Sequence, residues 1–176
     1  DLSYGLGVMR GEVDGWAWFG HGGAFQSGLS ATRVVPGQGL AVSVLTNAID
    51  GPAADWAGGV LHVLKAFAER GAPLARTRDW SGRWWGLWDT FDLVPFRERV
   101  LIAAPDLARP FDHVPEVEVI GRDTGVVALA GGFEIHGEPI ALVRGRDGRV
   151  REVDAQGSRY LPETRFRAAL RRRHGA

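Results

Sequence analysis

Turn-forming residues interrupt the second half of the chain at short, regular intervals. Between residues 80 and 162, apolar segments are broken roughly every 8–12 residues by proline or glycine, a spacing typical of a small antiparallel barrel or sandwich. The strongest of these signals is Asp147-Gly148, which separates the strand-like segments 140–143 and 150–153. This pattern predicts a β-barrel over residues 80–164.

The first 46 residues also favour antiparallel strands. Segments 4–10 and 15–20 have the composition of strands, and the second places Trp16, Trp18 and Phe19 at alternating or adjacent positions. The turn signal at 36–39 lies between two segments rich in β-branched residues, 31–35 and 40–46, and predicts a hairpin.

A helix is predicted from Pro52 to Arg70. Proline suits a first helical turn, and Gly71 followed by Pro73 is a stop signal. The helix would have one apolar face, formed by Trp56, Val60, Val63, Leu64 and Phe67. We interpret residues 73–79 as a linker and residues 165–176 as an arginine-rich tail that frays or forms a short surface helix.

Composition excludes several classes of function. The 21 basic and 21 acidic residues cancel, which argues against a general attraction to nucleic acid. There is no cysteine, so thiol chemistry and zinc-thiolate sites are excluded, and no apolar run is long enough to span a membrane. No signal peptide is visible, and the start at Asp1 suggests a truncated or processed chain whose compartment the sequence leaves open.

The segment that suggests chemistry is His21-Gly22-Gly23, followed by Ala24 and Phe25. Glycine weakens a strand interior and often marks the close approach of a ligand or another backbone. On its own, however, such a triplet favours a glycine bulge beside a surface histidine. The flanking residues decide between these interpretations.

Upstream of the triplet stands Tyr4-Gly5-Leu6-Gly7, and downstream Leu45-Thr46-Asn47 closes a strand before the predicted helix. In this order and spacing, these features resemble the C-terminal part of the transpeptidase-like domain of serine β-lactamase-like hydrolases. That family comprises penicillin-binding proteins, class C β-lactamases, esterases and D-aminopeptidases. The resemblance implies an α+β fold in which residues 1–72 contribute C-terminal strands and the terminal helix of an incomplete catalytic domain.

The resemblance also implies roles for single residues. His21 would occupy the position of the basic residue in the family's third active-site triplet, beside the substrate and the nucleophile's proton network. Gly22 and Phe25 would contact the substrate, which would lie along the strand at Gly22 and Gly23. The backbone N–H of Ala24, after Gly23, would donate to a developing oxyanion.

Two motifs of that family are absent from the chain. The nucleophile requires Ser-x-x-Lys, but the one lysine, Lys65, is preceded three positions earlier by His62. Neither tyrosine begins a Tyr-x-Asn motif. We therefore expect the parent protein to carry the nucleophile in a missing N-terminal half of the catalytic domain, and this chain alone to be inactive.

The second half resembles the lipocalin-like barrel that often follows this catalytic domain. The segments that carry this resemblance are Gly82-Arg83-Trp84, Gly137-Glu138-Pro139-Ile140, Asp147-Gly148-Arg149-Val150 and Arg159-Tyr160. The clustered tryptophans Trp80, Trp84, Trp85 and Trp88 favour packing over an aromatic ligand platform. His113 and His136 lack the paired spacing of metal ligands, so we expect neither a metal nor a cofactor.

Two functions remain open. The chain would be a fragment of a serine hydrolase that acts on peptides, esters or β-lactams through an acyl-enzyme. Alternatively, it would be a non-catalytic binding or regulatory chain whose barrel holds a small apolar ligand. In either case, strands 1–46 alone would expose an apolar face and a sheet edge, so we expect self-association, with homo-oligomers as one form.

The missing Ser-x-x-Lys motif makes a direct prediction. A fluorophosphonate or β-lactam probe should not label this chain stoichiometrically, because no serine has the neighbouring lysine that this mechanism uses to activate it. Intact-mass spectrometry after incubation with the probe measures the outcome. One adduct per chain would contradict the prediction.

Overall fold

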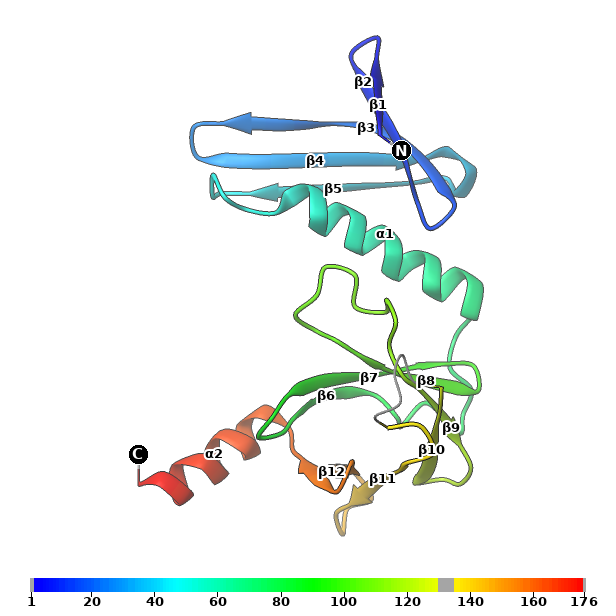
Figure 1. The fold of residues 1–176 in the computed structure, drawn as a ribbon, viewed down its shortest axis with the longest axis vertical. Coiled ribbons are helices and arrows are strands. Elements are labelled where there is room, and N and C mark those ends of the chain that lie inside the picture. The colour runs from blue at the N-terminus through cyan, green and yellow to red at the C-terminus, as the bar shows by residue number, and fades with distance from the viewer. Residues whose placement is uncertain (1, 130–134, 176) are drawn as a thin grey trace. The chain divides into compact units, whose positions relative to one another are not determined.

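The computed structural model describes residues 2–129 and 135–175 (Figure 1). These residues form two compact units, which divide between Glu69 and Arg70. The described residues have an α+β fold with two antiparallel sheets and two α-helices, which confirms the expected class at this level. Neither helix is long and apolar enough to cross a membrane.

The first unit is a five-stranded antiparallel meander followed by a helix. Its strands are hydrogen-bonded in sequence order. The elements are β1 (Ser3–Gly5), β2 (Val8–Val13), β3 (Trp16–Phe25), β4 (Gly28–Val35), the 3-10 turn η1 (Pro36–Gln38), β5 (Leu40–Thr46) and α1 (Ala53–Arg70). The hairpin predicted around residues 36–39 is confirmed, with Val35 opposite Leu40.

The single strand predicted at 4–10 is wrong. Leu6 and Gly7 both have positive φ, 54° and 79°, and they turn the chain between β1 and β2. A glycine adopts this backbone conformation readily, whereas leucine rarely does, so the sequence pattern gave little sign of the turn at Leu6.

The helix α1 agrees with the predicted bounds, but the face predicted to be apolar is not the buried one. Ala53, Ala57 and Leu61 are at most 3% exposed and pack on the sheet, whereas Trp56 and Val60 are 50% and 41% exposed. The small alanines, spaced four residues apart, let the helix approach Ala31 of β4 closely. The larger apolar side chains are therefore turned away from the sheet.

The second unit is an eight-stranded antiparallel meander with a C-terminal helix. Its strands pair in sequence order. The elements are β6 (Gly82–Trp85), β7 (Thr90–Phe96), β8 (Arg99–Ala103), β9 (Glu116–Val119), β10 (Thr124–Leu129), β11 (Pro139–Arg144), β12 (Val150–Ala155), β13 (Ser158–Tyr160) and α2 (Glu163–His174). The hairpin predicted at Asp147-Gly148 is confirmed between β11 and β12.

The meander closes on itself. Trp85 of β6 and Leu161, directly after β13, exchange two backbone hydrogen bonds of 2.8 and 2.9 Å. Gly86 makes this closure feasible, because a Cβ there would lie 2.5 Å from the Tyr160 ring. The first and last strands thus meet and give a nearly closed barrel.

Large side chains fill the interior of this barrel. Trp80, Trp84, Phe91 and Tyr160 are at most 4% exposed and belong to one core cluster. Burial, with a contribution from Asp89, raises the pKa of Tyr160 to about 12. In contrast, Trp88 is 88% exposed, so the tryptophans that follow one another in sequence do not form one surface.

The segment expected to be a linker, and the tail expected to fray or to form a short surface helix, both belong to the second unit. Thr77 is fully buried, and its Oγ1 donates to the carbonyl oxygen of Arg97 at 2.6 Å. The tail forms most of α2, and Phe166 of this helix stacks on Trp85 with ring centroids 6.5 Å apart.

The barrel core makes a prediction for stability. Trp80→Ala should lower the free energy of unfolding by about 3–5 kcal/mol, because it leaves a large cavity in a close-packed interior. Trp88→Ala is the matched control and should change stability by less than about 0.5 kcal/mol. Urea denaturation followed by circular dichroism measures both values, and equal effects of the two substitutions would contradict the prediction.

Candidate functional site

The strand that carries His21-Gly22-Gly23 has a partner on only one side along its second half. β2 pairs with β3 from Val13↔Trp16 to Met9↔Gly20 and no further. β4 continues alongside β3 as far as Phe25↔Gly28. Figure 1 shows β1 and β2 turning away from the far end of β3. Within the part of the chain that the structure describes, residues 21–25 therefore form a free sheet edge, which we call the β3 rim.

Hydrogen bonds next to the rim show which way its backbone groups point. The N–H of Leu29 donates to Thr46 Oγ1 (3.4 Å), and that hydroxyl in turn donates to the Leu29 carbonyl oxygen (3.3 Å). Leu29 thus directs its backbone groups toward β5, and its partner Ala24 must direct its own away from β4. Because this direction alternates along a strand, Gly22 and Ala24 present N–H and C=O groups at the rim.

The side chain of His21 lies against the rim itself. Its Nδ1 contacts the carbonyl oxygen of Gly22, and its Nε2 lies 3.4 Å from the Tyr4 hydroxyl. Both contacts are satisfied if Nδ1 carries the proton and Nε2 accepts from the tyrosine. His21 then covers one rim acceptor, which leaves the N–H of Gly22 and both backbone groups of Ala24 exposed.

A groove of about 480 Å³ runs beside the rim. Its lining comes from the β3–β4 hairpin and from the start of α1, and comprises Gly22, Gly23, Ala24, Leu29, Ser30 and residues 51–55. The structure thus brings together three of the five predicted site residues in this groove. His21 and Phe25 belong to the same rim but do not line it.

Sequence reasoning missed the other wall of this groove, residues 51–55, and the arginine that bonds to it. Arg33 donates to the carbonyl oxygen of Ala54 at 2.8 Å and lies over the Trp18 ring, 4.7 Å from its centroid. Burial lowers the pKa of Arg33, and the charge of Asp55 opposes that shift. A guanidinium whose partner is 21 positions away along the chain leaves no local sequence signal.

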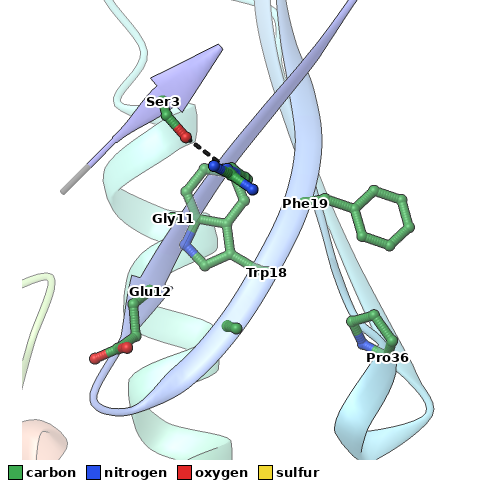
Figure 2. Close-up of a pocket in the computed structure, with 8 residues that line it drawn as sticks. Ser3, Gly11, Glu12, Trp18, Phe19 and Pro36 are labelled. Carbon is green, nitrogen blue, oxygen red and sulfur yellow. Dashed lines mark hydrogen bonds between the residues drawn. The ribbon is translucent and has the colours of Figure 1, made fainter. Parts of the chain in front are cut away.

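A second concavity, of about 580 Å³, lies between β2 and β3 (Figure 2). Arg10 donates to the Ser3 hydroxyl at 2.8 Å, and Glu12 accepts from the N–H of Gly15 at 3.2 Å. Gly11 lies against the Trp18 ring, where a Cβ would come within 2.9 Å. None of the predicted site residues lines this concavity, so we take the β3 rim as the candidate site.

The rim has one serine hydroxyl beside its glycines. Ser30 lies opposite Gly23, and a Cβ at Gly23 would be 2.8 Å from its hydroxyl. Among the described residues, no histidine, lysine or carboxylate makes a hydrogen bond to this hydroxyl, whereas a serine nucleophile needs such a base. The described residues also contain no group of three or more histidine or acidic side chains suited to hold a metal ion.

No family model and no curated protein matches the chain. Solved structures do match, and two of them are described as SurE with D-Leu and as SurE. Each is 21% identical over 90% of this chain, with TM-scores of 0.39 and 0.38. Another is the octameric penicillin-binding protein homologue from Pyrococcus abyssi, 18% identical over 92% of the chain with a TM-score of 0.35. The chain spans 37–38% of these structures' lengths.

These findings correct the family assignment. The first structures matched are those of SurE, and no family model supports membership of the serine β-lactamase-like hydrolases. The match to the penicillin-binding protein homologue, 18% identical, is too distant to restore that assignment. The expected designations of serine hydrolase, esterase and D-aminopeptidase are therefore withdrawn.

The alternating directions along the rim predict opposite effects of proline at neighbouring positions. Gly23→Pro should destabilise the first unit by about 1–3 kcal/mol, because it removes an N–H that faces β4 and leaves an acceptor there unpaired. Ala24→Pro should be tolerated, because its N–H faces the rim. Denaturant unfolding of both variants tests this, and a greater loss for Ala24→Pro would show that the directions are reversed.

Proposed function

We propose that the first unit binds an extended, amide-containing ligand, such as a short peptide, which adds to the β3 rim as a further strand. The observation that carries this proposal is the outward direction of the backbone groups of Ala24, next to an outward N–H at Gly22. An exposed row of strand donors and acceptors is the usual template for strand addition.

The dimensions of the rim set the size of the ligand. Five residues of strand extend for roughly 16 Å, which leaves room for three or four ligand residues. The glycines suit this role, because Gly22 and Gly23 place no side chain beside the incoming backbone. The adjoining groove of about 480 Å³ can take side chains from one face of the ligand.

Side chains on the opposite face would contribute selectivity. Along β3, His21, Gly23 and Phe25 point to one face, since side chains alternate across a strand. Phe25 is 79% exposed and offers an apolar contact at the end of the rim. His21 offers a ring edge whose Nε2 hydrogen-bonds weakly, because its distance to the Tyr4 hydroxyl is 3.4 Å.

This proposal concerns binding and assigns no reaction to the chain. The N–H of Ala24 would donate to a ligand carbonyl. This donor role is the part of the expected site that needs no nucleophile. The alternative function, a small apolar ligand inside the barrel, stays a prediction that the observations do not favour, because large buried side chains occupy the interior.

Peptide titration followed by NMR tests the proposal. Adding acetyl-tetra-alanine amide to the ¹⁵N-labelled chain should shift the amide signals of Gly22 and Ala24 more than those of Gly23. Ala24→Pro should weaken binding at least about tenfold, because one hydrogen bond is lost and the ligand carbonyl is left unpaired. The matched control, Ala24→Val, keeps the N–H and should retain the affinity.

Three outcomes discriminate further. Equal binding by the Ala24→Pro and Ala24→Val variants would overturn the proposal, as would shifts confined to the second unit. Shifts at Gly22 and Ala24 that grow with protein concentration in the absence of peptide would identify a second copy of the chain as the occupant. That result would support the expected self-association and replace the peptide as ligand.

A further inference from the structure

Three Arg-Asp dipeptides occur in the second unit, and the fold gathers them at one end of the barrel. They are Arg78-Asp79 before β6, Arg122-Asp123 between β9 and β10, and Arg146-Asp147 between β11 and β12. In an antiparallel meander, alternate turns lie at the same end, which is also the end where the first strand begins. We call this the Arg-Asp end of the barrel.

The aspartates of these dipeptides already have partners within the barrel. Arg144 binds Asp79 at 2.9 Å and Asp123 at 2.6 Å, and it also donates to the carbonyl oxygen of Gly148. Asp147 pairs with Arg151. The guanidinium of Arg144 holds the pKa of Asp123 below its usual range, and that of Arg151 does the same for the pKa of Asp147.

Among the described residues, Arg78 and Arg122 of these dipeptides, and Arg149 just after Arg146-Asp147, form no such ion pair. Arg78, Arg122 and Arg149 are exposed and form no ion pair in the described part of the chain, whereas Arg83 and Arg99 on the barrel strands are paired with Asp92 and Glu118. These three unpaired arginines line one groove of about 530 Å³, together with the hydroxyl-bearing Ser81.

The floor of the groove is held in place by the core. The buried indole of Trp80 donates through Nε1 to the carbonyl oxygen of Arg122 at 3.3 Å, and the N–H of Leu142 donates to the carbonyl oxygen of Asp123 at 2.8 Å. Arg144 joins the segment before β6 to the β9–β10 turn. The three segments that carry the arginines are thus fixed relative to one another.

We propose that the Arg-Asp end of the barrel is a binding site for a small polyanion of the phosphate or pyrophosphate class. Arg144 and Arg151 offset two of the three carboxylate charges of Asp79, Asp123 and Asp147, so with Arg78, Arg122 and Arg149 the groove keeps a net positive charge. Guanidinium groups bind phosphate oxygens in paired hydrogen bonds, and a hydroxyl such as that of Ser81 adds a further donor. This site is independent of the β3 rim.

Calorimetric titration of the full chain with sodium pyrophosphate tests this proposal. Pyrophosphate should bind with about 1:1 stoichiometry and more tightly than inorganic phosphate. The double variant Arg122→Gln with Arg149→Gln should bind at least about tenfold more weakly, because it removes two charge-assisted contacts. Neither side chain forms an ion pair, so the melting temperature of the double variant should stay close to that of the unsubstituted chain.

The control removes more charge from another place. A triple variant of α2, with Arg171, Arg172 and Arg173 each changed to Gln, loses three positive charges and should bind pyrophosphate as the unsubstituted chain does. A greater loss of affinity in this triple variant than in the double variant would overturn the proposal, because attraction would then follow net charge alone. Absence of binding at millimolar pyrophosphate would also overturn it, as would a marked preference for a single-stranded oligonucleotide.

Discussion

The first unit depends on the point at which β3 loses one of its two neighbours. The Asp14-Gly15 turn, with positive φ at both residues, sets the register of β2 on β3. The turn at Leu6 and Gly7 makes β2 begin at Val8, so β2 is too short to pair with β3 beyond Gly20. Beyond Gly20, β3 therefore has backbone groups that no described strand satisfies. Gly20 itself must be a glycine, because a Cβ there would overlap the carbonyl oxygen of Thr32. The rim is thus a consequence of strand lengths and turn positions. The contribution of Gly22 and Gly23 is that they place no side chain there.

In the second unit, by contrast, the two edge strands of the sheet meet. Its outer strands meet through Trp85 and Leu161, so closure removes most of the edge that an open sheet would expose. Exposed cross-strand ion pairs contribute little to stability, and the barrel therefore depends mainly on its filled interior. The buried Glu152 accepts from the exposed Arg159, which holds the pKa of Glu152 below its usual range and ties β12 to β13. An edge left open and an edge closed explain why the two proposed sites differ in kind: one uses backbone groups and the other uses side chains.

Sequence patterns predicted the features that depend on local chemistry. Asp147-Gly148 and the residues around Pro36 specify turns directly, and the helix from 52 to 70 has clear start and stop signals. The buried face of α1 could not be read in the same way, because Ala53 and Ala57 pack closely against Ala31, a long-range fit that favours small residues over the more apolar stripe at Trp56 and Val60. The sequence also did not indicate the positive φ of Leu6, since leucine rarely adopts that conformation. The family assignment failed for a related reason: short segments such as Tyr4-Gly5-Leu6-Gly7 describe a strand-and-turn pattern that unrelated sheets can share.

The candidate site was predicted in part. Gly22, Gly23 and Ala24 were expected on a strand edge, and they lie there because pairing with β2 stops at Gly20. The wall formed by residues 51–55 was missed, because it reaches the rim only through the packing of α1 on the sheet. The Arg-Asp dipeptides were visible in the sequence, but their convergence requires the parity of an antiparallel meander, which places alternate turns together. The strand order brings these dipeptides to one end of the barrel, where Arg78 and Arg122 line a groove together with Arg149. The order and pairing of the strands therefore determine the position of both proposed sites more than any single motif does.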